Sequence, residues 1–212
     1  MSLEPDKTGL TGGSGRMNII SVILNSIVVL DMLVMSVLIF YRDKKWSLAN
    51  GKKALKYFTF LSNEFFALAA LLMILLPNSY AVWIVKFVGT VAITITFLTV
   101  LVFLGPVLGY KRVLEGRDFV LHIVNPVLAI VSFCFFERRN MPFPYCLFGL
   151  LPVLLYGTWY FYKVMLAPEG KKMDDFYGFN KNNKWILSVI LMSLGTFAVC
   201  AAYWGIMLIN RG

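Results

Sequence analysis

Six long apolar runs constrain this chain more than any other feature of its sequence. They lie near residues 17–40, 55–77, 80–104, 118–136, 143–165 and 185–209. A helix needs roughly 20 apolar residues to cross a hydrocarbon layer about 30 Å thick, and the runs have about that length. The sequence therefore predicts an all-α integral membrane protein, a bundle of six transmembrane helices.

The composition agrees with this fold class. Hydrophobic residues make up 59% of the 212 residues and charged residues only 15%, whereas about a quarter of a soluble domain is charged. The apolar runs are continuous rather than alternating, so a β-barrel is not expected. No internal repeat supports an inverted-repeat transporter. Residues 1–16 are polar and Gly-rich, and we expect a flexible tail or an added leader there, with 17–212 forming the membrane domain.

Lys and Arg residues gather on one side of the predicted bundle. The loops after helices one, three and five, with their edges, hold 14 of the 20 basic residues. The positive-inside rule then predicts a multi-pass cell-membrane protein with these three loops in the cytoplasm. The net charge of +9 follows from this bias, so membrane lipids rather than nucleic acid are the expected partners. The sequence leaves the oligomeric state open.

Few ionisable groups fall inside the predicted spans, and such groups are costly there. Asp31 lies in helix one, Glu64 in helix two and His122 in the first turns of helix four. At a rise of about 1.5 Å per residue, Asp31 and Glu64 are roughly 14 Å from the cytoplasmic face. Lys86 lies near a helix end, and we expect it to reach the interface.

A second polar level lies nearer the cytoplasmic face. Thr59 and His122 are each four residues into their helices, roughly 6 Å deep. Thr59, Ser62 and Asn63 share one face of helix two. Such residues also serve purely structural roles, since Thr bonds to its own preceding turn and Ser and Asn join neighbouring helices.

Metal and cofactor chemistry are not indicated by the sequence. One His without ligand-spaced carboxylates cannot form a closed zinc site, and haem bundles usually use paired axial ligands. We therefore expect no metal and no cofactor. Cys134, Cys146 and Cys200 lie in or beside spans and are interpreted as small apolar side chains, with a Cys134–Cys146 bridge left open.

One stretch of helix two resembles a known family. Residues 56–63 read KYFTFLSN, similar to the Lys-Tyr-x-Thr-x-Leu-Asn stretch of the androgen-induced protein and the androgen-dependent regulator of tissue factor pathway inhibitor. These six-helix membrane proteins use a Thr and a His to hydrolyse fatty acid esters of hydroxy fatty acids. The resemblance implies that Thr59 is the nucleophile and His122 the base.

The helix-four motif of that family departs from this chain. The family has Asn-His-x-x-His-Thr with the second His catalytic, whereas residues 120–126 here read VLHIVNP. Aligned by spacing, Asn125 stands at the catalytic position and His122 at the first His, and either assignment stays open.

The implied reaction is hydrolysis of an amphiphilic lipid ester through an acyl-threonine intermediate. Ser62, Asn63 or Asn125 would donate hydrogen bonds to the oxyanion, and Asp31 or Glu64 would support His122. This hypothesis predicts a cavity between helices two and four. Residues 174–179 of the last loop would then form a lid over the site, or else an ordinary interfacial loop anchored by its aromatic residues. Two alternatives remain: a non-catalytic membrane scaffold or lipid-binding protein, and a proton-coupled carrier using Asp31 and Glu64.

Overall fold

The computed structural model describes residues 18–42 and 44–209 of the chain. Over these residues the protein is an all-α bundle, and six of its helices are long and apolar enough to cross a membrane. The spans are Ile19–Phe40, Phe58–Leu75, Tyr80–Leu108, Arg117–Phe136, Phe143–Leu166 and Trp185–Leu208. The prediction of a multi-pass, six-helix membrane protein is confirmed. The predicted tail, 1–16, lies outside the described residues.

Three spans are single helices and three are composite. The single helices are α1 (Ile19–Phe40), α3 (Phe58–Leu75) and α11 (Trp185–Leu208). The composite spans contain, in chain order, α4 (Tyr80–Leu98), η1 (Thr99–Leu104), α5 (Gly105–Leu108), α7 (Arg117–Phe119), η2 (Val120–Val124), α8 (Asn125–Val131), η3 (Ser132–Phe136), α9 (Phe143–Cys146), η4 (Leu147–Leu150), α10 (Leu151–Phe161) and η5 (Tyr162–Leu166). The segments between spans contain β1 (Tyr41–Arg42), β2 (Lys45–Trp46), α2 (Leu48–Ala54), α6 (Tyr110–Val113) and η6 (Lys181–Asn183).

Proline explains two of the π-helical segments. Pro106 follows η1 and Pro126 follows η2, and a proline removes one helical hydrogen bond and crowds the carbonyl four residues earlier. These carbonyls belong to Val102 and His122, inside the two π-helical segments. A wider turn relieves the crowding without ending the helix. The third span consequently continues to Leu108, beyond the predicted end at residue 104.

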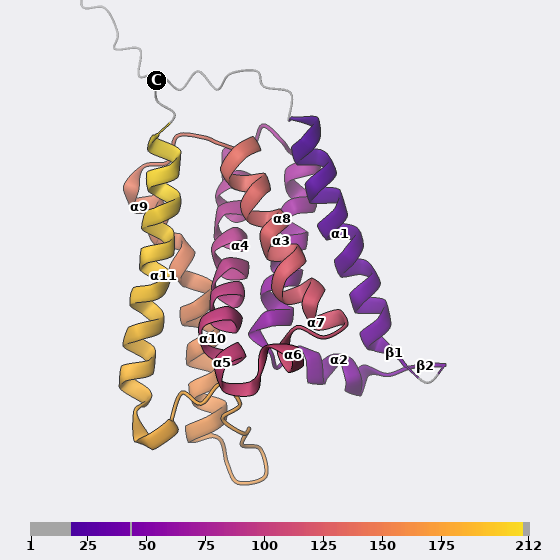
Figure 1. Cartoon of the computed structure of the whole chain (residues 1–212), viewed down its shortest axis with the longest axis vertical. Coiled ribbons are helices and arrows are strands. Elements are labelled where there is room, and N and C mark those ends of the chain that lie inside the picture. Colours follow the sequence, from indigo (N-terminus) through magenta and orange to yellow (C-terminus); the bar gives the residue numbers. More distant parts are fainter. Residues whose placement is uncertain (1–17, 43, 210–212) are drawn as a thin grey trace, which may run out of the picture.

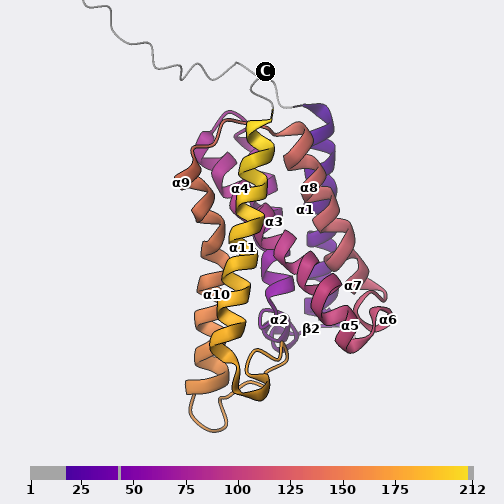
Figure 2. The same ribbon diagram turned by 60° about the vertical axis from the view of Figure 1, so that its left-hand side comes forward.

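The six spans lie side by side, with α3 and α4 between two outer groups. Figures 1 and 2 both place α10 and α11 on one side of the bundle and α1 on the other. α4 contacts α3, α8, η4 and α11 and is the most enclosed element. We call the end that holds residues 41–42, 44–57, 109–116 and 167–184 the basic end, and the end that holds 76–79 and 137–142 the opposite end.

The core has two halves that meet at α4. One half joins α4 to η3 and α11 through aromatic side chains such as Trp83, Phe133 and Tyr203. The other joins α1, α3 and α8 through Met32, Phe66 and other apolar residues. Large aliphatic side chains point outward from α1, α10 and α11 instead of into this core. An outer surface of this kind suits lipid rather than water.

Candidate functional site

The stretch that resembles the family, 56–63, lies at the basic end and begins α3. Thr59 is half-buried in the first turn, and its carbonyl accepts hydrogen bonds from Ser62 Oγ at 3.0 Å and Asn63 Nδ2 at 2.8 Å. Ser62 Oγ also lies 2.7 Å from Thr96 Oγ1 of α4. The predicted shared face of Thr59, Ser62 and Asn63 thus exists, and two of its three side chains make contacts that join helices or close the first turn.

Asn63 and Asn125 connect the second span to the fourth. Asn63 Nδ2 donates to the Leu121 carbonyl at 3.1 Å, and Asn125 Nδ2 donates to Asn63 Oδ1 at 3.1 Å. Both side chains are completely buried. These hydrogen bonds join the second and fourth spans, as buried Asn side chains often do between membrane helices. Asn125 Oδ1 has no hydrogen-bond partner among the described residues.

A narrow cavity of about 40 Å³ lies beside Thr59. Its lining residues are Phe58, Thr59, Thr96, Thr99, Val100, Leu104, Val153, Tyr156, Gly157, Tyr177, Phe179 and Met192. They come from α3, α4, η1, α10, α11 and the last loop. The predicted cavity between the second and fourth spans is not the one found, because none of these residues belongs to the fourth span. A space of this size admits a small polar group or a few methylenes rather than a whole acyl chain.

Tyr177 closes the start of α3 from a loop far away in the sequence. No side chain next to α3 caps its first turn, and the Phe58 amide instead donates to the Tyr177 hydroxyl at 3.0 Å. The same hydroxyl interacts with Thr59 and with the Tyr156 hydroxyl. Burial raises the pKa of Tyr177 to about 12. The phenol therefore keeps its proton at neutral pH and can donate a hydrogen bond beside Thr59.

Asp175 orders the loop that carries Tyr177. Its Oδ1 accepts hydrogen bonds from the Tyr160 hydroxyl and the Phe179 amide, both at 2.9 Å, and its Oδ2 accepts from the Asn180 amide at 2.7 Å. The Tyr160 hydroxyl in turn accepts from the Tyr177 amide at 3.1 Å. Tyr177 and Phe179 both line the cavity. The loop thus covers the cavity, as a lid would, and whether it opens remains a prediction.

His122 makes a contact away from Thr59. Its Nδ1 lies 2.6 Å from the carbonyl oxygen of Val113 in α6. If this nitrogen carries the proton, Nε2 is left with a free lone pair. No hydrogen bond joins Thr59 and His122 in the described part of the chain, and His122 does not line the cavity. The helices that carry them are nevertheless adjacent, since Asn63 bonds to the carbonyl of Leu121.

Asp31 and Glu64 do not form a pair. Glu64 Oε1 accepts a short hydrogen bond from Ser36 Oγ of α1. Glu64 is thus paired with the Ser36 hydroxyl, more than one helical turn along α1 from Asp31. Asp31 is only partly buried and has no hydrogen bond or ion pair with any described residue. Neither carboxylate forms a hydrogen bond or ion pair with His122 in the described part of the chain. In this arrangement neither Asp31 nor Glu64 gives His122 the support that the hydrolase hypothesis expected. The two carboxylates also do not form the joint proton site that the carrier alternative requires.

The sequence reasoning missed a polar cluster near the opposite end. Lys86 does not reach the interface, so that expectation is wrong: its side chain and that of Glu137 are fully buried, with Nζ 3.5 Å from Glu137 Oε1. Glu137 Oε1 also accepts hydrogen bonds from Ser21 Oγ (2.6 Å), Asn25 Nδ2 (2.6 Å) and Ser132 Oγ (2.7 Å). Lys86 donates a short bond to Asn25 Oδ1 and lies over the Phe66 ring.

This outer cluster, Ser21, Asn25, Lys86, Ser132 and Glu137, holds three spans together. The four-residue spacing of Ser21 and Asn25 on one helix face is the sequence signal that could have indicated it. Burial alone would raise the pKa of Glu137, but the Lys86 charge and three hydrogen bonds hold that pKa below its ordinary value. Glu137 is therefore an anion at neutral pH, which Lys86 neutralises.

No metal site is formed by the described residues, among which no group of three or more His, Cys, Asp or Glu side chains comes together. Cys134, Cys146 and Cys200 are free and buried. Comparison with protein-family models, with curated proteins and with solved structures found no match to this chain. The resemblance of residues 56–63 therefore stays a prediction.

Proposed function

We propose that this protein is an intramembrane hydrolase of lipid esters, such as fatty acid esters of hydroxy fatty acids, with Thr59 as its nucleophile. One observation carries the proposal. Thr59 lines a cavity at the basic end, in the first turn of α3, with the protonated phenol of Tyr177 at its side. A nucleophile and a hydrogen-bond donor for the oxyanion are two of the parts that acyl transfer needs, and the general base is the third.

In the proposed reaction, Thr59 Oγ attacks the ester carbonyl carbon and gives its proton to His122 Nε2. The Tyr177 hydroxyl donates to the oxyanion as the new C–O bond forms. The ester C–O bond then breaks, and the leaving hydroxy acid takes the proton from His122. Water attacks the acyl-threonine with His122 again as base, which releases the fatty acid and restores Thr59. For these transfers the His122 side chain would turn from its contact with Val113 toward the cavity, which it does not line in this structure.

The cavity suits the ester group of an amphiphile rather than its chains. Val100, Leu104, Val153 and Met192 provide an apolar wall from which the acyl chain would continue into lipid. The carboxylate of a hydroxy fatty acid would stay at the interface, near exposed lysines of the basic end such as Lys56.

Purified protein in detergent or nanodiscs would be tested for hydrolysis of a long-chain fluorogenic ester and of a fatty acid ester of a hydroxy fatty acid. Thr59→Ala is expected to lower kcat about 10³-fold or more, while Thr59→Ser keeps part of it. Tyr177→Phe is expected to lower kcat about 10²-fold through loss of the oxyanion donor. Thr99→Ala, which alters another lining hydroxyl, is the matched control and should stay near wild type.

Two outcomes would reject parts of this mechanism. Unchanged turnover in Thr59→Ala would remove Thr59 as nucleophile. Turnover lost in Thr59→Ala but kept in His122→Ala would assign the base to a group other than His122.

A second candidate is a non-catalytic lipid-binding protein. The observation in its favour is that the lining set contains no His, Asp, Glu, Lys or Arg, so the cavity itself holds no group with the usual basicity of a catalytic base. For this candidate the wild-type protein would show no turnover. Native mass spectrometry would find a retained lipid or fatty acid on the wild type and on Thr59→Ala alike.

We also infer that the basic end faces the cytoplasm of the cell membrane, because its loops hold 12 of the 20 Lys and Arg residues and Arg117 and Lys163 lie at the adjoining span ends. Labelling of introduced cysteines at Lys111 and Lys171 in intact cells checks this orientation. A membrane-impermeant reagent that reaches both positions from outside would reverse it.

A further inference from the structure

A short basic arm projects from the bundle between the first two spans. The segment 41–57 contains β1, β2 and α2, and we call it the basic arm. β1 and β2 pair antiparallel, with Tyr41 opposite Trp46. Figure 1 shows this hairpin extending sideways beyond α1 rather than continuing below the bundle. Because α1 ends at Phe40, the arm begins where that span leaves the hydrocarbon.

The arm is fixed against the end of α1. The Ser47 amide donates to the Phe40 carbonyl at 2.7 Å, and the Ser47 hydroxyl accepts from the Asn50 amide at the start of α2. Gly51 is buried against the Phe40 ring so closely that a Cβ atom there would lie 1.9 Å from the ring. These contacts hold α2 beside the end of the first span.

The arm carries a concentrated positive charge. Over residues 41–57 the sequence has six basic residues and one acidic residue, whereas the last loop, 167–184, has four basic and three acidic. Lys44, Lys45, Lys52 and Lys53 are all exposed. The only ion pair within 18–42 and 44–209 is Lys86–Glu137, so none of these lysines is neutralised by a described carboxylate.

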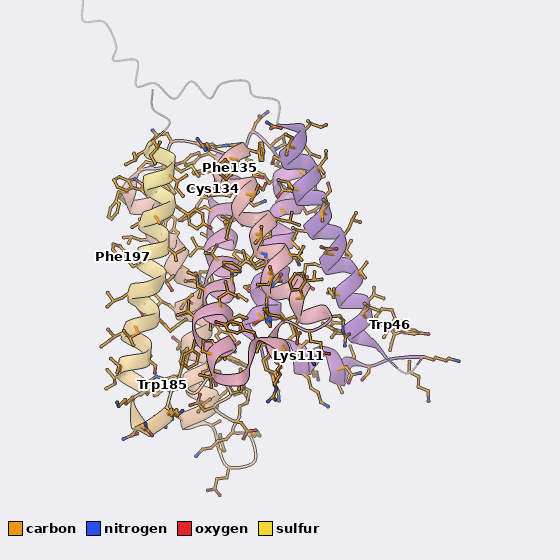
Figure 3. The ribbon with its side chains drawn as sticks, viewed as in Figure 1. Trp46, Lys111, Cys134, Phe135, Trp185 and Phe197 are labelled. Atoms are coloured by element: carbon orange, nitrogen blue, oxygen red, sulfur yellow. The ribbon has the colours of Figure 1, made fainter. Side chains whose placement is uncertain are left out.

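Apolar groups accompany this charge. Trp46 is 68% exposed and Leu48 75% exposed, although both are large hydrophobic residues. The Trp46 ring meets Tyr41 edge-on, with centroids 5.7 Å apart. Figure 3 shows Trp46 directed away from the bundle beside the end of α1. Aromatic rings next to lysines at the end of a span are typical of contact with headgroups and the outer acyl region.

We propose that the basic arm binds the headgroups of anionic phospholipids. Lys44, Lys45, Lys52 and Lys53 hold the phosphates, while Trp46 and Leu48 enter the upper acyl region. The proposal goes beyond the general charge bias of membrane loops. The last loop lies at the same end of the bundle, but its basic and acidic residues nearly balance, whereas the arm has a clear excess of lysines. It does not depend on any hydrolytic activity.

Quenching of Trp46 fluorescence by brominated lipids tests the proposal. The protein is reconstituted in vesicles of phosphatidylcholine with a minor fraction of phosphatidylglycerol, with bromine on the acyl chains of only one of the two lipids. Subtracting the signal of Trp46→Phe isolates the contribution of Trp46. The variant that replaces Lys44, Lys45, Lys52 and Lys53 with Gln is compared with a control that replaces Lys171, Lys172, Lys181 and Lys184 with Gln.

The expected result is that phosphatidylglycerol is enriched around Trp46 at least about twofold over its bulk fraction, since each Lys near the surface attracts anionic lipid. The enrichment should vanish in the arm variant, persist in the loop control, and weaken as salt is raised. Quenching in proportion to the bulk fraction would overturn the proposal and leave the arm available to an acidic protein partner. Enrichment that survives in the arm variant would overturn it as well.

Discussion

Removal of Lys86 is the perturbation with the clearest energetic consequence. In Lys86→Met, Glu137 keeps the hydrogen bonds from Ser21, Asn25 and Ser132 but loses the ammonium group at 3.5 Å. The completely buried carboxylate would then lack its ion-pair partner. In Glu137→Gln the reverse holds, since the buried ammonium loses the carboxylate charge and keeps neutral partners, Asn25 and the Phe66 ring among them.

The expected loss in unfolding free energy depends on whether Lys86 and Glu137 act as a buried ion pair or as an ordinary hydrogen-bonded pair, and the two values differ enough to be distinguished by measurement. Removing one partner of a buried ion pair costs about 3–5 kcal/mol, whereas a hydrogen bond between membrane helices contributes about 0.6 kcal/mol on average. Both side chains are 0% exposed, so the larger value is expected for each single variant. The double variant Lys86→Met with Glu137→Gln leaves no buried charge, and the neutral amide keeps its neighbours. We expect it to lose no more than about 2 kcal/mol, which makes the two changes strongly non-additive.

Reversible unfolding in sodium dodecyl sulfate, followed by circular dichroism, would measure the free energies of the wild type and three variants. Lys111→Met, at an exposed position, is the control and should change the value by less than about 0.5 kcal/mol. The reasoning is refuted if each single variant loses under about 1 kcal/mol, or if the double variant loses the sum of the two single losses.

Two further predictions concern packing and pH. Gly149→Ala should lower the unfolding free energy by about 1–3 kcal/mol, because its Cβ would lie 2.5 Å from Cys200 Sγ and 3.0 Å from Val91; Gly195→Ala, with no atom within 4 Å of the new Cβ, should not. The lowered pKa of Glu137 gives stability that is complete above its unfolded pKa of about 4.3 and is lost as pH falls through the folded pKa. Midpoints of unfolding in sodium dodecyl sulfate should fall as pH is lowered from neutral. The fall with pH should be smaller in Glu137→Gln, which has no carboxylate at this position.

The fold could be predicted because one physical requirement dominates it. A chain in lipid must satisfy its backbone within each span, and apolar length alone then locates the helices. The bounds differ where local chemistry intervenes. The second span begins at Phe58 rather than 55, because Ser47 starts the separate helix α2 and the chain turns before α3. The third span passes Pro106 by a π-helical segment that periodicity does not indicate.

The site was harder to predict because its contacts join residues far apart in the sequence. Depth along a helix correctly placed Thr59 near the basic end, but depth does not give the direction in which a side chain points. Thr59 thus lines a cavity with Tyr156 and Tyr177, while His122, at similar depth, contacts Val113. Lys86 was assigned to the interface because a lysine so near a helix end usually reaches it. Only the packed structure shows Glu137 close enough to neutralise it.

The two polar regions of the bundle differ in a way that bears on function. In the outer cluster a buried ion pair and the hydrogen bonds around it fix α1, α4 and η3, and none of its residues lines the cavity. Such an arrangement stabilises one packing of the helices and resists change. At the basic end the polar groups beside the cavity are neutral hydroxyls, one of them presented by a loop that Asp175 orders. Rearranging them requires no charge to be separated. A reaction or a ligand exchange is therefore expected at the basic end, with the outer cluster serving as the fixed part of the bundle.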